Sequence, residues 1–330
     1  MSTTKKWNYV FGPIPSRRLG LSLGVDVIPK KVCTLDCVYC EVGVTDKRAL
    51  RRREYFPAEA IIEEVENALS GRANLDYISF SGSGEPTLNS KLGEIIRAVK
   101  QMTSIPTAVI TNGTLFSLDD VRYDLMAADV VLPSLDAVSQ DVFEKIDRPH
   151  PQLQIETIIK GLVEFRTEFK GQIWLEIMIA NGYNDHEEEI RKMKETIASI
   201  RPDKIQLNTV IRPPSERGVE PVSQSRLKEI QIIFGDRCEI IGSYDKHSSG
   251  NSGKSNPTEI LALLERRAMT LDGLVNSQNA SKDNVVESLR ALKDAGLIVS
   301  FIHQNEEHYR AKEAAKAEES QKRVSSRTAT

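Results

Sequence analysis

The chain has 330 residues, in which 44 Lys and Arg nearly balance 47 Asp and Glu, so its net charge gives no argument for a nucleic acid or a membrane as partner. No apolar run is long enough to span a bilayer, and residues 1–8 lack the apolar core of a signal peptide, so we expect a cytoplasmic protein with no membrane partner. Three of the four cysteines lie in one short segment, which excludes a disulfide framework.

From about residue 20, apolar strand-like runs alternate with amphipathic helical runs, as in repeated βα units around a parallel sheet. The predicted strands are 21–27, 77–81, 107–111, 130–134, 173–179 and 204–208. The predicted helices are 58–70, 92–102, 118–127, 155–169, 186–200 and 223–234. The pattern indicates an α/β fold with six βα units. A Rossmann-type sheet is the alternative, but a cysteine loop follows the first strand where a Gly-rich turn would be needed.

That loop carries Cys33, Cys37 and Cys40, spaced Cys-x3-Cys-x2-Cys. Three thiolates without a fourth suit a 4Fe–4S cluster in which one iron has no protein ligand. A zinc site would need a fourth ligand, and the nearest histidine in the sequence, His150, is far away along the chain. Buried thiols are the remaining alternative. The spacing therefore favours a cluster with an open iron.

The cysteine spacing resembles that of the radical S-adenosylmethionine (SAM) superfamily, and residues 11–20 (FGPIPSRRLG) and 22–26 (SLGVD) resemble a branch related to wyosine synthases. The resemblance implies a partial (β/α)6 TIM-like barrel, with Cys33, Cys37 and Cys40 as ligands of the 4Fe–4S cluster. It implies that SAM binds the open iron and is cleaved reductively to a 5′-deoxyadenosyl radical. An external donor such as flavodoxin or ferredoxin would supply the electron. Because such a cluster is sensitive to oxygen, we expect an anaerobic or microaerobic host.

The same resemblance implies roles for residues at the ends of the predicted strands. Ser83-Gly84-Glu85 is similar to the Gly-Gly-Glu motif that holds the methionine ammonium, and the aromatic residue before the third cysteine would contact adenine. The Asn-Gly turn after the third strand and the polar pair after the fourth would lie near the cofactor, although Asn-Gly is also an ordinary turn. Alternation in the fifth strand points Glu176 into the barrel. The predicted cofactor-binding residues are Tyr39, Ser83, Gly84, Glu85, Asn112, Ser134, Asp136 and Glu176.

Loops after the fourth and sixth strands place Arg148, His150 and Arg212 at the open rim of the barrel, where loops carry function in parallel barrels. These three residues are candidates for contacts with substrate, although structural arginines are common in loops. The basic run 47–53 follows the cysteine loop and is a candidate phosphate contact, with a solvated charged surface as the alternative.

Composition divides the chain into a barrel (residues 1–242), a Ser/Gly/Asn linker (243–256), a small domain (257–310) and a polar tail expected to be disordered (311–330). The small domain should contain helices at 258–267, 271–276 and 281–294, then strands at 297–300 and 308–310 around residues 304–307. Three helices and a hairpin resemble a winged helix-turn-helix domain. The basic residues of its third helix are balanced by acidic ones, which argues against specific DNA binding.

These observations predict a single-cluster radical SAM enzyme that abstracts hydrogen from an unidentified peptide, protein or RNA. One alternative is a DNA-binding regulator whose cluster senses redox state or SAM. Another is a wyosine-synthase-like enzyme that modifies a tRNA base. Such enzymes use a second cluster, which Cys238 alone cannot supply.

Overall fold

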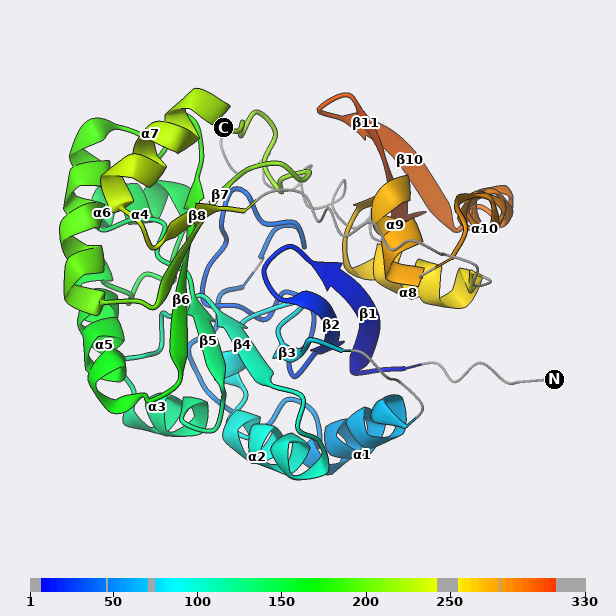
Figure 1. The fold of residues 1–330 in the computed structure, drawn as a ribbon, viewed down its shortest axis with the longest axis horizontal. Coiled ribbons are helices and arrows are strands. Elements are labelled where there is room, and N and C mark those ends of the chain that lie inside the picture. The colour runs from blue at the N-terminus through cyan, green and yellow to red at the C-terminus, as the bar shows by residue number, and fades with distance from the viewer. Residues whose placement is uncertain (1–6, 46, 71–74, 242–254, 279, 313–330) are drawn as a thin grey trace.

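The computed structural model describes residues 7–45, 47–70, 75–241, 255–278 and 280–312. Its main body is a curved sheet of eight strands that lie in chain order, with helices along its outer face (Figure 1). The strands are β1 (Val10–Ser16), β2 (Gly20–Val25), β3 (Tyr77–Phe80), β4 (Thr107–Thr111), β5 (Val130–Pro133), β6 (Gln172–Ile179), β7 (Lys204–Thr209) and β8 (Cys238–Ile240). β1 pairs with β2 in antiparallel fashion, and each later pair is parallel.

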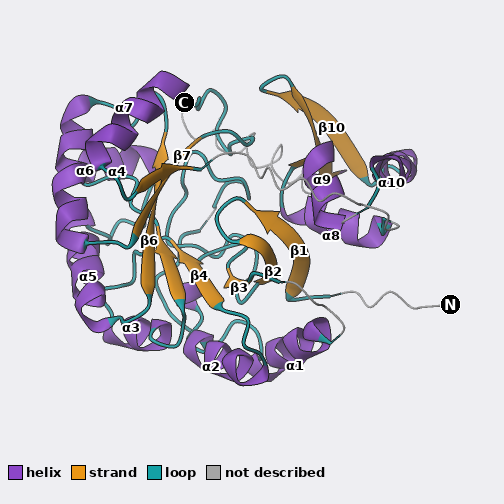
Figure 2. Ribbon diagram, viewed as in Figure 1, coloured by secondary structure: helices purple, strands orange, loops and turns teal. Residues whose placement is uncertain are grey.

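Helices connect the parallel strands and lie along the outer face of the sheet (Figure 2). Each of the longer helices packs an apolar stripe against the sheet. They are α1 (Ala58–Leu69), η1 (Pro86–Leu88), α2 (Leu92–Met102), α3 (Asp119–Leu125), α4 (Gln140–Ile146), α5 (Ile155–Glu168), α6 (Glu187–Ile200) and α7 (Gln224–Phe234). In α2 the buried residues include Leu92, Ile95, Ile96 and Val99, at helical spacing. No helix in the described ranges combines the length and apolar character that a bilayer crossing requires.

The predicted α/β fold with a partial barrel is confirmed: all six predicted strands and six predicted helices of the main body are present, with ends shifted by at most two residues. The sequence did not predict β1, α4 or β8. β1 contains Pro13 and Pro15, which normally argue against a strand, but it lies at the sheet edge, where proline is tolerated, and has an irregular register between Phe11 and Ile14. α4 and β8 are too short to give a clear periodic pattern.

A smaller C-terminal unit contains α8 (Pro257–Arg266), β9 (Met269–Thr270), α9 (Leu271–Gln278), α10 (Lys282–Asp294), β10 (Ile298–His303) and β11 (Glu306–Ala311). Its antiparallel sheet has the order β10-β11-β9. The three predicted helices and the hairpin are present. The turn itself is confined to Gln304 and Asn305, both at positive φ, and Glu306 and Glu307 belong to β11. Positive φ at both central residues is the geometry of a two-residue hairpin turn.

The C-terminal unit packs on the edge of the main sheet, beside β1 (Figure 1). Ile14 of β1 is buried in the same apolar cluster as Leu264 and Leu289 of the C-terminal unit, and Phe11 packs against that cluster. The guanidinium of Arg266 lies over the Phe11 ring at 4.6 Å. Most of the predicted linker (243–256) and of the predicted tail (311–330) lies outside the described residues.

Candidate active site

A cavity of about 320 Å³ opens where the parallel strands end, between the cysteine loop and the C-terminal unit. Its wall combines residues after β3, β5 and β7 with residues of β1, β2, β6 and α8. Of the predicted site residues, it brings together Cys37, Tyr39, Cys40, Ser83, Ser134, Asp136, Glu176 and Arg212. The prediction that polar side chains converge at this end of the barrel agrees with this geometry.

The cysteine loop is fixed to its neighbours by backbone hydrogen bonds. Asp36 N donates to Asp147 O (3.0 Å) and Val38 N donates to Ile146 O (2.9 Å), at the end of α4. Ala49 N donates to Cys33 O (2.8 Å), which joins the start of the loop to its return segment. The three cysteines are therefore held on a loop whose main chain is anchored at both ends.

The three thiols of the loop form no disulfide, and two of them accept hydrogen bonds from neighbouring side chains. Lys31 Nζ donates to Cys40 Sγ (3.3 Å), and Asn112 Nδ2 donates to Cys33 Sγ (3.6 Å). Burial raises the pKa of Cys33 to about 12 and that of Cys37 well above its usual range. Cluster ligands must be thiolates, so cluster insertion here releases protons.

Within the described ranges, no three His, Cys, Asp or Glu side chains converge tightly enough to hold a single metal ion. A cuboidal cluster places its thiolates on different irons, so its ligands need not meet at one point. A donor set of three thiols on one anchored loop, with a lysine ammonium to balance thiolate charge, fits such a cluster. Lys31 was not predicted, and its position two residues before Cys33 was the available signal.

The turn after β3 docks directly on the start of the cysteine loop. Lys31 N donates to Ser83 O (2.7 Å), and Glu85 N donates to Val32 O (2.9 Å). A Cβ on Gly84 would lie 2.3 Å from Val32 O, so only glycine allows this approach. Asp26, at the end of β2, accepts hydrogen bonds from Ser83 N (2.8 Å) and Ser83 Oγ (3.3 Å).

Glu85 is buried behind this turn, with 2% of its surface exposed, and is not part of the cavity wall. Its Oε1 accepts hydrogen bonds from Thr87 N (3.0 Å), Thr87 Oγ1 (2.6 Å) and Thr111 Oγ1 (2.6 Å). Its Oε2 accepts one from Asn112 N (2.8 Å). The carboxylate therefore joins the ends of β3 and β4, and the predicted contact with the SAM ammonium stays a prediction.

Tyr39 separates the cavity from a small pocket beneath it. Its hydroxyl donates to Asp136 Oδ2, and Met178 N donates to Asp136 Oδ1 (2.7 Å). Burial, reinforced by nearby Asp147, raises the pKa of Asp136 well above its usual range, and burial raises the pKa of Asp147 to about 7. Both carboxylate oxygens of Asp136 are thus engaged in hydrogen bonds within the wall.

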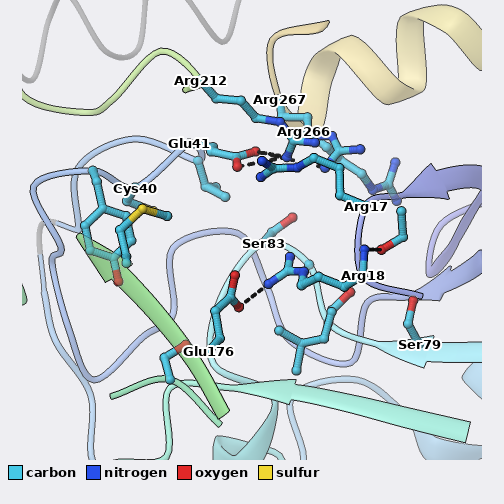
Figure 3. Close-up of a pocket in the computed structure, with 18 of the residues that line it drawn as sticks. Arg17, Arg18, Cys40, Glu41, Ser79, Ser83, Glu176, Arg212, Arg266 and Arg267 are labelled. Carbon is cyan, nitrogen blue, oxygen red and sulfur yellow. Dashed lines mark hydrogen bonds and ion pairs between the residues drawn. The ribbon is translucent and has the colours of Figure 1, made fainter. Parts of the chain in front are cut away.

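Arginines surround the upper part of the cavity in Figure 3. Arg17 and Arg18 lie in the β1–β2 turn, Arg212 follows β7, and Arg266 and Arg267 end α8. Of these, only Arg212 was predicted as a site residue. The adjacent arginines at 17–18 and 266–267 were visible in the sequence, but nothing there indicated that the two pairs meet.

Two other rim candidates lie outside this cavity wall. Arg148 pairs with Glu216, and His150 accepts a hydrogen bond from Gln152 N (3.2 Å). In the basic run, Arg52 pairs with Asp120 and Asp124. These arginines therefore stabilise loops.

Cys238 lies buried in β8, also away from the cavity wall.

Residues 27–193 match the family model of the radical SAM superfamily. A Brachyspira hyodysenteriae protein named GTPase Obg is 37% identical over 89% of this chain, but the chain spans only 44% of that protein. The UPF0026 protein of Methanocaldococcus jannaschii is 36% identical over 83% of this chain and 88% of its own length. A UPF0026 protein of Helicobacter pylori strain J99 is 32% identical, covering 83% of this chain and 89% of that protein.

Solved structures share the fold. A radical SAM methyltransferase from Sphaerobacter thermophilus has a TM-score of 0.51 and 17% identity, and the match covers 66% of each chain. The structure of TYW1 with a lysine-pyruvate adduct has a TM-score of 0.50 and 18% identity, over 68% of this chain and 75% of that one. The match of residues 27–193 shows that the chain belongs to the radical SAM superfamily, whose cofactors are a 4Fe–4S cluster and SAM and whose enzymes take an electron from an external donor.

Proposed function

We propose that this protein is a single-cluster radical SAM enzyme in which Cys33, Cys37 and Cys40 bind the 4Fe–4S cluster. The bound cluster supplies one electron for the cleavage of SAM, and the resulting 5′-deoxyadenosyl radical abstracts a hydrogen atom from the substrate. Flavodoxin or ferredoxin is the expected source of that electron. The family alone does not decide between a small molecule and the peptide, protein or RNA expected from the sequence as the substrate.

The observation that carries this proposal is the docking of the Ser83–Glu85 turn on the cysteine loop. Two backbone hydrogen bonds and a close approach at Gly84 bring the turn beside Cys33 and Lys31. Cys33, Cys37 and Cys40 would hold the cluster, and the Ser83–Glu85 turn beside them would contribute to holding SAM. Cys37 and Cys40 reach that cavity from one side and Ser83 from another, which supports a shared site for cluster and SAM.

In this proposal the other predicted residues shape the cofactor pocket. Tyr39, held by Asp136, would offer a ring face at the cavity wall for the adenine. Ser134 and Asp136 would lie near the ribose. Glu176 accepts a hydrogen bond from Asn208 Nδ2 (2.7 Å) and pairs with Arg18, which fixes its carboxylate at the cavity edge.

The C-terminal unit contains three helices and a hairpin, and we interpret it as a winged-helix module that docks the substrate. The regulator alternative is less well supported because α8 contributes Arg266 and Arg267 to the same cavity as the cysteines. On α10, the amine of Lys282 lies 3.5 Å from Asp272, and that of Lys293 donates to Ser300 Oγ (2.9 Å). Neither observation favours a helix devoted to DNA phosphates.

The tRNA-modifying alternative has no specific support in the site. The fourth cysteine of the sequence, Cys238, is buried in β8, and burial raises its pKa to about 12. An inert buried thiol is a poor ligand for a second cluster. The likeness to TYW1 is one of fold.

Iron analysis of cysteine variants tests the cluster assignment. After anaerobic reconstitution, the protein should hold about four irons and four sulfides per chain. Cys33→Ala, Cys37→Ala and Cys40→Ala should each lose them, because a remaining pair of thiolates cannot retain the cluster. The reduced wild-type protein should also release 5′-deoxyadenosine from SAM.

Cys238→Ala is the matched control, since it removes a buried thiol from the same sheet and should retain full iron content. Loss of iron in this variant equal to the loss in Cys37→Ala would contradict the assignment. So would a loaded wild-type protein that binds SAM but never cleaves it.

A further inference from the structure

Five arginines line one side of the cavity, and they come from three separate parts of the chain. Figure 3 shows Arg17, Arg212, Arg266 and Arg267 gathered around Glu41, while Arg18 reaches Glu176. Guanidinium groups repel one another, so such a cluster is stable only when anions compensate it. The nearby carboxylates of the protein supply part of this compensation.

Three of the arginines have a close carboxylate partner. Arg212 Nη1 donates to both Glu41 oxygens (2.7 and 2.8 Å), Arg266 Nε donates to Asp26 Oδ2 (3.2 Å), and Arg18 pairs with Glu176. Arg267 reaches the same Glu41 at only 4.0 Å. Arg17 Nη1 is buried and has no hydrogen-bond partner within the described residues.

The charges therefore do not balance inside the site. Even with Asp26, Glu41 and Glu176 all ionised, the five arginines leave two positive charges without a carboxylate. Asp136 also lines the cavity, but its oxygens accept hydrogen bonds from Tyr39 and Met178 N rather than from these arginines. A dianion would match the remaining charge.

The electrostatics of the individual groups agree with this reading. Burial, followed by the field of Arg212, lowers the pKa of Arg17 to about 10 and that of Arg267 to about 9. Arg17 and Arg267 therefore stay charged at pH 7, and a further anion in the cavity would stabilise both guanidinium groups.

We propose that Arg17, Arg212 and Arg267 bind a phosphate monoester group of a small substrate, an inference that rests on the proposed function and specifies its substrate class. Arginine forks match phosphate oxygens in geometry, and a monoester carries close to two negative charges at neutral pH. Glu41 follows Cys40 directly, so the phosphate would be held in the same cavity as the cluster ligands. A phosphodiester of RNA carries a single charge, and the basic run that could follow an RNA backbone has Arg52 committed to Asp120 and Asp124.

Calorimetric titration with inorganic phosphate tests the site. The full chain is reconstituted anaerobically and saturated with SAM, so that no open iron is available to phosphate, and ionic strength is kept constant. Phosphate should bind the wild type. Phosphate binding should be roughly ten- to a hundredfold weaker in Arg17→Gln than in the wild type, as expected for the loss of a charged hydrogen bond. The phosphate affinity of Arg17→Lys should lie between those of the wild type and Arg17→Gln. Glu41→Gln should bind more tightly, because it releases Arg212 and Arg267.

Arg226→Gln is the control, because Arg226 is half-buried like Arg17 but pairs with Glu229 on α7, outside the cavity wall. It should bind phosphate like the wild type. Equal phosphate affinity in Arg17→Gln and wild type would overturn the proposal, as would tighter binding of succinate than of phosphate. In the iron-free chain, displacement of bound phosphate by SAM would assign the arginines to the cofactor carboxylate. Displacement of phosphate by an RNA without terminal phosphate would assign them to a phosphodiester.

The titration is independent of the chemistry in the proposed function. Iron content and SAM cleavage are measured on every variant, so a loaded, SAM-cleaving protein that ignores phosphate contradicts only this inference. The iron-free chain is titrated in parallel. Phosphate binding by the iron-free chain supports the arginine site even if the three cysteines prove not to hold a cluster.

Discussion

Glu85 accepts four hydrogen bonds from its protein surroundings, although its motif resembles one that binds the ammonium of SAM. Two of the donors are backbone N–H groups, of Thr87 and Asn112. A buried carboxylate with this many donors connects the β3 and β4 ends, and any contact with SAM would be added to that role.

Replacing Glu85 separates these two roles. Glu85→Ala leaves two buried N–H groups without an acceptor, at about 1–3 kcal/mol each, so we expect the free energy of unfolding to fall by about 2–6 kcal/mol. Glu85→Gln keeps one acceptor oxygen, so its free energy of unfolding should fall by less than that of Glu85→Ala. Denaturant unfolding of the iron-free chain measures both, with Glu59→Ala on an exposed position of α1 as control. Unchanged stability together with lost SAM binding would show that Glu85 acts through the ligand alone.

The cysteines and the Ser83–Glu85 turn could be predicted because each is contiguous in the sequence. The arginine cluster could not, because its members are separated by up to 250 residues. Arg17 and Arg18 lie within residues 11–20, the segment that resembles a branch of the superfamily. The sequence of a turn between two strands does not indicate which part of the chain that turn faces. Asp26 was missed for the same reason, since its partners Ser83 and Arg266 come from distant segments.

At the scale of elements, the β3 turn and the cysteine loop form a single structural unit. The loop is irregular, and its shape depends on backbone hydrogen bonds to the turn and to α4. Glycine at position 84 is needed for the close approach, because its neighbour is a backbone carbonyl that cannot move aside alone.

A methyl group at this point should displace the loop. Gly84→Ala would bring its Cβ to 2.3 Å from Val32 O and 3.0 Å from Ile28 Cγ2, so we expect a lower iron content after reconstitution. Iron and sulfide analysis measures this. Gly273→Ala, in α9, is the control, since its Cβ would approach nothing closer than Thr270 Oγ1 at 3.3 Å. Full iron content in Gly84→Ala would mean that the loop tolerates the displacement.

The alternation of helices and strands predicted the order of elements in the barrel well, because long amphipathic segments carry a strong periodic signal. It failed for β1, whose prolines obscure an edge strand, and for β8, which has three residues. β1 is the more serious omission, because it carries the turn with Arg17 and Arg18 and contacts the C-terminal unit.

At the scale of the whole molecule, the C-terminal unit and the barrel share an apolar cluster. Ile14 of β1 belongs to the apolar cluster of the C-terminal unit, and β1 contacts α8 and α9. Composition indicated a separate unit after residue 242, but a sequence pattern does not reveal which face of the barrel that unit covers.

This shared packing should couple the stabilities of the two parts. Leu264 is fully buried in α8, so Leu264→Ala should cost about 2–5 kcal/mol. We expect faster amide hydrogen exchange in β1 as well as in α8–α10, measured by mass spectrometry. Leu118→Ala, at a half-exposed position outside this cluster, is the control. Faster exchange limited to the C-terminal unit would contradict the coupling.

The carboxylate of Asp26 has one further consequence. It accepts hydrogen bonds from Ser83 in the β3 turn and from Arg266 at the end of α8. Separation of α8 from the barrel would leave this buried acid without its arginine, and an unpaired buried carboxylate takes up a proton. Its hold on the Ser83 backbone would weaken at the same moment. We therefore expect the seating of the C-terminal unit on the barrel and the position of the Ser83–Glu85 turn to be coupled through this one carboxylate.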